Sequence, residues 1–262
     1  MPRWRSLGCR APLWIYRHNT EAPRWISGQD SGFLNRVRWF DSERGHRRRI
    51  LLRVRVAGVD ATKGGWVAVE LVDGRFAGAH LIRPIETDFA ALADVEVIAV
   101  DVPIGFGPRL ADPAARRYLV GAASTVFSTP PRDVLATPFA PGLGVSAQAH
   151  ALGPRILHVT ELAERDPRVR EVHPEVSFRA MNDGRRLEHR KKSSGGVIER
   201  LQVLKRHGIV VGDLGDAATA PIDDVLDDAA AAWSAERGAC GAAESLPAPP
   251  EERHGRATAI WY

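Results

Sequence analysis

The run from Val95 to Asp101 is the feature that most narrows the folds open to this chain. Apart from Glu96 it is apolar up to its closing aspartate, and such runs are typical of strands that are buried on both faces of a sheet. An earlier β-rich run, Val54 to Asp60, also ends in an aspartate. The two runs predict an α/β domain with a central sheet flanked by helices.

The order of the next elements predicts a mixed sheet. A second strand, Trp66 to Val72, is followed by the turn signal Asp73-Gly74, so Arg75 to Ile82 should return as a third antiparallel strand. A short helix, Glu86 to Ala93, then leads to the strand at 95–101. A strand after such a crossover is expected to lie parallel to an earlier one. We therefore expect three antiparallel strands followed by parallel ones.

The second half of the chain is predicted to add helices and two strands. Its patterns indicate helices at Ala147–Glu164, Val197–His207 and Asp223–Arg237, strands at Val169–Val176 and Thr258–Tyr262, and a Pro-rich loop at Leu246–Pro250.

Residues 1–53 differ in composition from the rest of the chain. They hold twelve Arg, four of the seven Trp, no Lys and only four acidic residues, without a sustained period. We interpret them as a basic extension that is poorly ordered, or as an upstream extension of the reading frame with a natural start near Leu52 or Val54. The alternative is an arm in which Arg pairs with phosphates and Trp stacks on bases. Residues 54–262 form the predicted domain, with 24 basic and 28 acidic residues.

No membrane or secretion signal is evident in the sequence. No stretch approaches the 18 consecutive apolar residues of a membrane span, and the first apolar run, Ala11 to Tyr16, is too short for a signal-peptide core. We expect a soluble, cytoplasmic protein without a membrane partner.

Asp60 and Asp101 are the first candidates for chemistry. Each directly follows a buried strand, and adjacent parallel strands would bring both carboxylates to the one sheet edge where ligands of open α/β sheets bind. The alternative is structural, because Asp often caps backbone donors in turns after strands.

A third acidic signal lies in the predicted last helix. Asp224 and Asp227 are three residues apart and share one helix face. Repulsion within this acid-rich segment would be relieved by a bound cation, whereas the alternative is an acidic helix start capped by Asp223. Hard cations such as Mg²⁺ or Mn²⁺ take oxygen ligands, and two-metal phosphoryl chemistry needs several carboxylates gathered together. The three signals together predict a carboxylate site for divalent metal.

Seven short motifs, in this order, resemble the family known as domain of unknown function 429, described as predicted nucleases with an RNase H-like fold. They are Gly58-Val-Asp60 with Gly65-Trp66, Val100-Asp-Val-Pro-Ile-Gly105, Ser128-Thr-Pro-Pro-Arg132, Glu171-Val-His-Pro-Glu-Val-Ser-Phe178, Lys192 with Gly196, Asp223-Asp-Val-Leu-Asp227 and Ile260-Trp-Tyr262.

The resemblance covers residues 55–262 and implies an RNase H-like fold. It also implies metal-binding and catalytic roles for the four aspartates listed here: Asp60, Asp101, Asp224 and Asp227. The chain departs from the family at Asp228, where Ala would be more usual, and this leaves open which helix carboxylate faces the metals. Residues 1–53 match nothing in the family.

Glu175 and His173 are further catalytic candidates. Glu175 is a possible additional ligand, ranked above Glu171, and His173 a possible general acid or base because its intrinsic pKa lies near neutrality. The structural alternative is a strand end with outward polar residues and a Pro that breaks pairing.

Basic residues are predicted to hold the substrate. Residues 179–206 carry a local excess of positive charge that includes Lys192 and Arg200, and the Pro-rich loop before Arg132 should place that side chain rigidly. A solvated helix face and a structural connector are the alternatives.

The first functional hypothesis is therefore a Mg²⁺- or Mn²⁺-dependent nuclease that acts on RNA or DNA by phosphodiester hydrolysis. Two alternatives use the same core: a non-catalytic nucleic-acid-binding or scaffold protein, and an actin-like nucleotide-binding ATPase or kinase. The latter usually has two such domains with Gly hairpins, whereas Gly64-Gly65 occurs once here.

Overall fold

The computed structural model describes residues 37–41, 47–51, 53–84 and 88–262, with the backbone alone for 37–51. The chain divides into two compact units, residues 1–53 and 54–262. In the first unit, β1 (Val37–Asp41) and β2 (Arg47–Leu51) pair as antiparallel strands, which the sequence did not predict. The interpretation of residues 1–36 lies outside the described residues.

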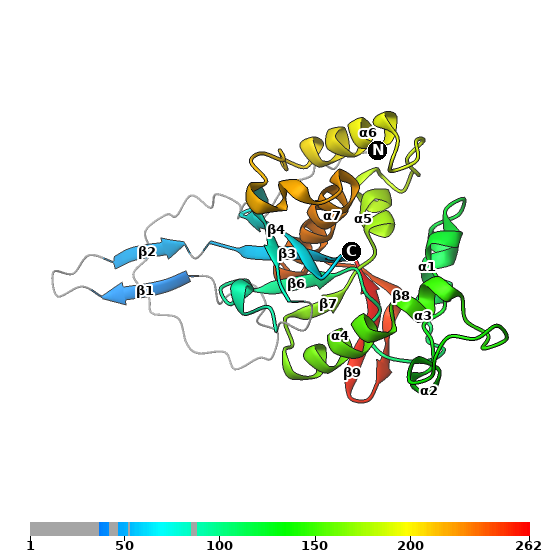
Figure 1. Cartoon of the computed structure of the whole chain (residues 1–262). Coiled ribbons are helices and arrows are strands. Elements are labelled where there is room, and N and C mark those ends of the chain that lie inside the picture. Colours follow the sequence, from blue (N-terminus) through cyan, green and yellow to red (C-terminus); the bar gives the residue numbers. More distant parts are fainter. Residues whose placement is uncertain (1–36, 42–46, 52, 85–87) are drawn as a thin grey trace. The chain divides into compact units, whose positions relative to one another are not determined.

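The second unit is built on a mixed five-stranded sheet (Figure 1). Its strands are β3 (Arg55–Thr62), β4 (Gly65–Val72), β5 (Arg75–Ile82), β6 (Val97–Val100) and β7 (Val169–Glu171), in the order β5-β4-β3-β6-β7. β4 pairs antiparallel with both β3 and β5, whereas β3, β6 and β7 run parallel. The predicted mixed α/β fold is confirmed, and this architecture is compatible with an RNase H-like fold.

A helix covers each face of the sheet. Alternate residues of β3 face opposite sides, so Val56 packs with the alanines of α7 (Ile222–Ala239), while Val59 packs with residues of α4 (Gly153–Arg165). Gly58 lets α7 approach the sheet closely, because a Cβ there would lie 2.0 Å from the backbone oxygen of Asp228. The lack of a side chain at Gly58 thus allows the short distance between α7 and β3.

Shorter elements complete the unit. They are the 3₁₀ helices η2 (Ala90–Leu92), η3 (Ala123–Thr125) and η4 (Gly215–Thr219), the helices α1 (Ala111–Tyr118), α2 (Arg132–Leu135), α3 (Ala147–Ala151), α5 (Pro174–Met181) and α6 (Ser194–Arg206), and the antiparallel strands β8 (Ser245–Arg253) and β9 (Arg256–Trp261). No helix among the described residues is long and apolar enough to cross a membrane.

The prediction of a strand from Val169 to Val176 was wrong in its second half. The strand ends at Glu171, and α5 begins at Pro174 after His173 as its N-cap residue. Proline suits the first turn of a helix because its fixed φ is already helical and its missing N–H has no partner to lose there. Glu175 therefore lies in the first turn of a helix.

Three other predicted boundaries were also wrong. The helix predicted at 147–164 is two helices, because Pro154 lacks the N–H that would continue the first. The Pro-rich stretch predicted as a loop is the strand β8, which pairs on one side with β9; proline is tolerated where a strand needs no donor. The helix predicted at 86–93 is only the turn η2, and residues 86 and 87 lie outside the described part.

Candidate functional site

Asp60 and Asp101 are brought together by the pairing of β3 with β6. Val59 and Val100 are partners in this parallel pair, and the Asp101 N–H donates to the Val59 carbonyl at 3.0 Å. Because Gly58 faces α7 and side chains alternate along a strand, Asp60 points to the α7 side, and Asp101 follows in register. Both aspartates lie half-buried at the carboxyl ends of their strands.

Helix α7, which packs on the sheet face towards which Asp60 points, adds three carboxyl groups. Asp224 is half-buried, whereas Asp227 and Asp228 are 2% and 0% exposed. Among the described residues, Oδ1 of Asp227 and both carboxyl oxygens of Asp228 have no hydrogen-bond partner. We call Asp60, Asp101 and these three residues the carboxylate cluster. Buried carboxylates without partners are costly, so such a group takes up protons or cations.

The pKa values in the carboxylate cluster reflect burial and mutual repulsion. Burial, strengthened by the charge of Asp227, raises the pKa of Asp101 to about 8. The pKa of Asp227 rises to about 6, also chiefly by burial, and those of Asp60 and Asp228 lie well above the usual range. Perturbed carboxyls that gather at a sheet edge are typical of a functional site.

Cationic side chains reach the cluster from the segment before α6 and from α6 itself. Nζ of Lys191 donates to Oδ2 of Asp227 at 2.7 Å. The buried Arg200 donates to Oε1 of Glu175 at 2.5 Å, and its Nε lies 3.8 Å from Oδ1 of Asp227. The guanidinium also lies over the ring of Phe178. Arg200 therefore holds Glu175 beside the carboxylate cluster.

A buried ion network fixes the loop that follows Asp101. Arg109 donates to both Glu171 and Asp112, and Oε2 of Glu171 accepts the N–H of Ile104 at 2.8 Å. Asp112 in turn accepts the backbone N–H of Thr129 at 2.9 Å. The network thereby joins the Val100–Gly105 and Ser128–Arg132 motifs to the end of β7.

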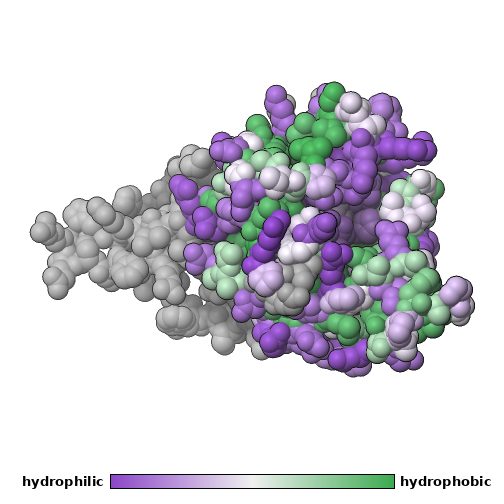
Figure 2. Space-filling model, viewed as in Figure 1, coloured by the Kyte–Doolittle hydropathy of each residue, from purple (hydrophilic) through white to green (hydrophobic). Residues whose placement is uncertain are grey.

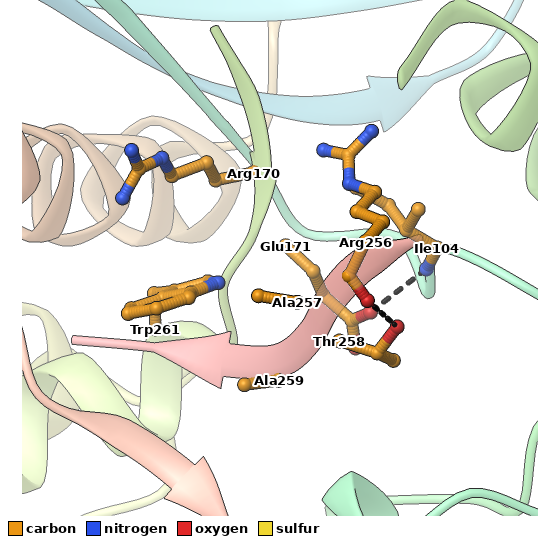
Figure 3. Close-up of a pocket in the computed structure, with 8 residues that line it drawn as sticks. All are labelled: Ile104, Arg170, Glu171, Arg256, Ala257, Thr258, Ala259 and Trp261. Atoms are coloured by element: carbon orange, nitrogen blue, oxygen red, sulfur yellow. Dashed lines mark hydrogen bonds between the residues drawn. The ribbon is translucent and has the colours of Figure 1, made fainter. Parts of the chain in front are cut away.

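The pocket in Figure 3 lies beside Glu171, between β7 and β9. Arg170 lies over the ring of Trp261 there, and Arg256 donates to the backbone oxygens of Ala163 and Val169. These contacts attach the C-terminal strands to the edge of the sheet.

The predicted substrate-binding residues fall in different environments. Arg132 is exposed at the start of α2, 3.7 Å from Glu161, and lies over the ring of Phe106. Lys192 is exposed, with its Nζ 3.9 Å from Oδ2 of Asp223, whereas Arg200 is buried. On the face drawn in Figure 2, hydrophilic and hydrophobic residues lie side by side over α6, which exposes Ile198 and Leu201.

The described residues do not form a finished metal site. In residues 53–84 and 88–262, no group of three or more Asp, Glu, His or Cys side chains is placed to hold an ion as it stands. The carboxylate donors and the unpartnered oxygens nevertheless suit a hard cation.

Two residues of the site, Asp228 and Arg109, were not predicted as functional from the sequence, and Lys191 was predicted only as part of the basic region 179–206. Lys191 and Lys192 are neighbours in the sequence, and of the two it is Lys191 that contacts Asp227. Asp228 had a signal, because it directly follows Asp227 in the acid-rich start of α7. Arg109 had a weak one, its spacing of three from Asp112.

A comparison with known protein families shows to which family the chain belongs. The model of a family described as "Protein of unknown function (DUF429)" matches residues 58–252. The chain belongs to this DUF429 family. No curated protein and no solved structure matches it. The matched range contains the whole carboxylate cluster and the Lys191 segment, so the site belongs to the family domain.

Proposed function

We propose that this DUF429 protein is a Mg²⁺- or Mn²⁺-dependent nuclease that hydrolyses phosphodiester bonds of nucleic acid in the cytoplasm. The observation that carries the proposal is the meeting of β3, β6 and α7 carboxyls, with buried oxygens that lack partners. Asp60, Asp101, Asp224 and Asp227 would hold the cation. When bound, the ion supplies activation of water and neutralisation of charge at the phosphate.

Two side chains would assist the ion: Lys191 would neutralise charge on the phosphate, and His173 would accept a proton. The side chain of Lys191 is 40% exposed, and its ammonium would meet a phosphate oxygen. Nε2 of His173 lies 3.4 Å from the Thr125 carbonyl and so carries the proton, which leaves Nδ1 as the acceptor. Burial lowers the pKa of His173, so the ring is neutral and able to accept a proton at neutral pH.

Exposed basic residues would hold the nucleic-acid backbone. Lys192 and Arg132 have side chains 79% and 65% exposed and are open to phosphates. Arg200 would act by positioning Glu175 instead of touching substrate. RNA and DNA offer the same phosphodiester chemistry to these groups, so both belong in the test.

The test is cleavage of single- and double-stranded DNA and RNA by the full chain, with Mn²⁺, Mg²⁺ or chelator. Asp101→Asn should abolish metal-dependent cleavage and leave the circular-dichroism spectrum unchanged. The matched control is Asp94→Asn, an exposed residue before the opposite end of β6, which should keep full cleavage. Nucleic-acid binding without cleavage by the wild type would favour the scaffold hypothesis, and tight ATP binding the actin-like one.

A further inference from the structure

Positive charge is distributed unevenly over the carboxylate cluster. Asp227 lies between Lys191 and Arg200, at 2.7 and 3.8 Å. Among the described residues, no Lys or Arg comes within ion-pair distance of the carboxyl groups of Asp60, Asp101, Asp224 or Asp228. The charge of Lys191 also acts on Asp101, and the charges of Lys191 and Lys192 act on Asp224, whereas the described groups that act most strongly on Asp60 and Asp228 include no Lys or Arg. We therefore call Asp227 the compensated side of the cluster, and Asp60 with Asp228 the uncompensated side.

Lys191 occupies the position of a small cation on the compensated side. Its Nζ is 2.7 Å from Oδ2 of Asp227 and 3.9 Å from Oδ2 of Asp223, so two carboxylates share one ammonium. An ammonium is a compact charge with three donors on a flexible stem. The distance of 2.7 Å from Nζ to Oδ2 of Asp227 is that of a charge-assisted hydrogen bond.

The backbone on which Lys191 stands is fixed by the start of α6. The hydroxyl of Ser193 donates to the Arg190 carbonyl at 2.8 Å and accepts the N–H of Gly196 at 3.1 Å. A Cβ on Gly196 would lie 2.0 Å from that same carbonyl oxygen, so only glycine allows this approach. These contacts fix the backbone on both sides of Lys191, and from this backbone its ammonium reaches Asp227.

Asp228 lies on the uncompensated side of the cluster. Its side chain is 0% exposed, and both oxygens lack partners. The charges acting on it come first from Asp60, then from Asp227 and Asp101, so it faces the cluster. An unpaired buried carboxyl either keeps its proton or binds a cation, and its position among other carboxyl groups suits a hard cation.

We propose that Lys191 is a resident cation of the carboxylate cluster, which takes one ion position beside Asp227 and leaves a single divalent ion to bind between Asp60, Asp101 and Asp228. The inference rests on the proposed metal dependence, and it replaces Asp224 and Asp227 in the proposed ligand set by Asp228. Two cations a few ångströms apart repel strongly in a buried site, so a second divalent ion would have to displace the ammonium.

The experiment counts Mn²⁺ bound per full-length chain, from the loss of the free-Mn²⁺ paramagnetic resonance signal at mildly alkaline pH. Wild type should bind one ion and Lys191→Met two, because the freed Asp227 and Asp223 become ligands. Lys191→Arg keeps the charge and should stay at one. Lys192→Met is the matched control: it removes the same charge from the neighbouring exposed residue and should also stay at one.

Thermal unfolding gives an independent measure. Without divalent ions, Lys191→Met should unfold at a lower temperature than Lys192→Met, and saturating Mn²⁺ should close most of that gap. Wild type binding two ions, or Lys191→Met still binding one, overturns this inference while the metal site stands. Wild type binding none overturns both this inference and the metal dependence of the proposed function. If Lys191→Met does not fold, Lys191→Gln replaces it in the same count.

Discussion

Nη2 of Arg109 lies 2.6 Å from Oε1 of Glu171 and 2.6 Å from Oδ1 of Asp112, and the three side chains are buried. Burial of one guanidinium between two carboxylates is favourable only while every charge keeps its partner. The network matters for the site because Glu171 also holds Ile104, three residues after Asp101. Its integrity therefore sets the position of a cluster carboxylate.

Arg109→Met should lower the free energy of unfolding by about 3–5 kcal/mol, the usual cost of leaving a buried charge without its partner. Urea denaturation followed by circular dichroism measures it. Arg117→Met is the control, because this side chain is exposed on α1, the helix that carries Asp112, and should change stability by less than about 0.5 kcal/mol. Equal effects in the two variants would show that the network is not structural.

The stability of the metal-free chain should fall as pH rises from about 4 to about 8. The pKa of Asp101 is raised to about 8, whereas an unfolded aspartate titrates near 3.9, so the folded state holds the proton over this window and the unfolded state loses it. Asp101→Asn removes this contribution. The difference in unfolding free energy, variant minus wild type, should therefore grow with pH to at most a few kcal/mol. Urea titrations in chelator at several pH values test it, and a difference independent of pH contradicts it.

Asp228→Ala should stabilise the metal-free protein. The substitution removes a carboxyl group that is fully buried and lacks partners, a situation that costs about 1–3 kcal/mol. Ser234→Ala is a control on the same helix with the opposite expectation, since the Ser234 hydroxyl is hydrogen-bonded to that of Ser177 at 2.8 Å and its loss should destabilise. Thermal unfolding in chelator separates them; destabilisation by Asp228→Ala would show that this carboxyl has a partner in solution.

Asp60→Asn should abolish stabilisation by Mn²⁺. An ion that binds only the folded state raises the unfolding midpoint with its concentration, and loss of one central carboxylate weakens that binding. The measurement is the midpoint of wild type and variant across a Mn²⁺ titration, with chelator to reverse it. Asp94→Asn, which lies before the end of β6 opposite to the cluster, should show the same shift of the unfolding midpoint as wild type. A variant that is stabilised as much as wild type would remove Asp60 from the ligand set.

The sheet and the positions of Asp60 and Asp101 were predictable because the information is local. Apolar runs that end in aspartate specify buried strands and their ends, and the Asp73-Gly74 turn, with φ of 51° and 72°, specifies the hairpin between β4 and β5. The start of α5 was also marked locally, by Pro174, but the preceding β-branched residues favoured a longer strand.

The cationic half of the site was not predictable in the same way. Lys191 reaches Asp227 across 36 residues of sequence, and nothing in the Lys191-Lys192 pair says which ammonium turns inward. Gly196 approaches the Arg190 carbonyl closely just before this pair, and such a contact is a property of the packed helix start. Spacing within one element is readable from a sequence, whereas pairing between elements depends on how they dock.

Gly58→Ala tests whether the approach of α7 to β3 assembles the site. A methyl group on Gly58 would lie 2.0 Å from the Asp228 backbone oxygen and 2.4 Å from the Ala232 nitrogen, so the helix must shift away from the strand. We expect a loss of at least about 1–3 kcal/mol in unfolding free energy and weaker Mn²⁺ binding, because Asp60 then parts from the α7 carboxylates. Gly78→Ala on β5, where the nearest atom is a flexible His80 side chain at 3.4 Å, should leave Mn²⁺ binding unchanged. If both variants bind Mn²⁺ like wild type while Gly58→Ala is destabilised, the close contact serves folding alone, and the carboxylates of α7 are not needed for the ion.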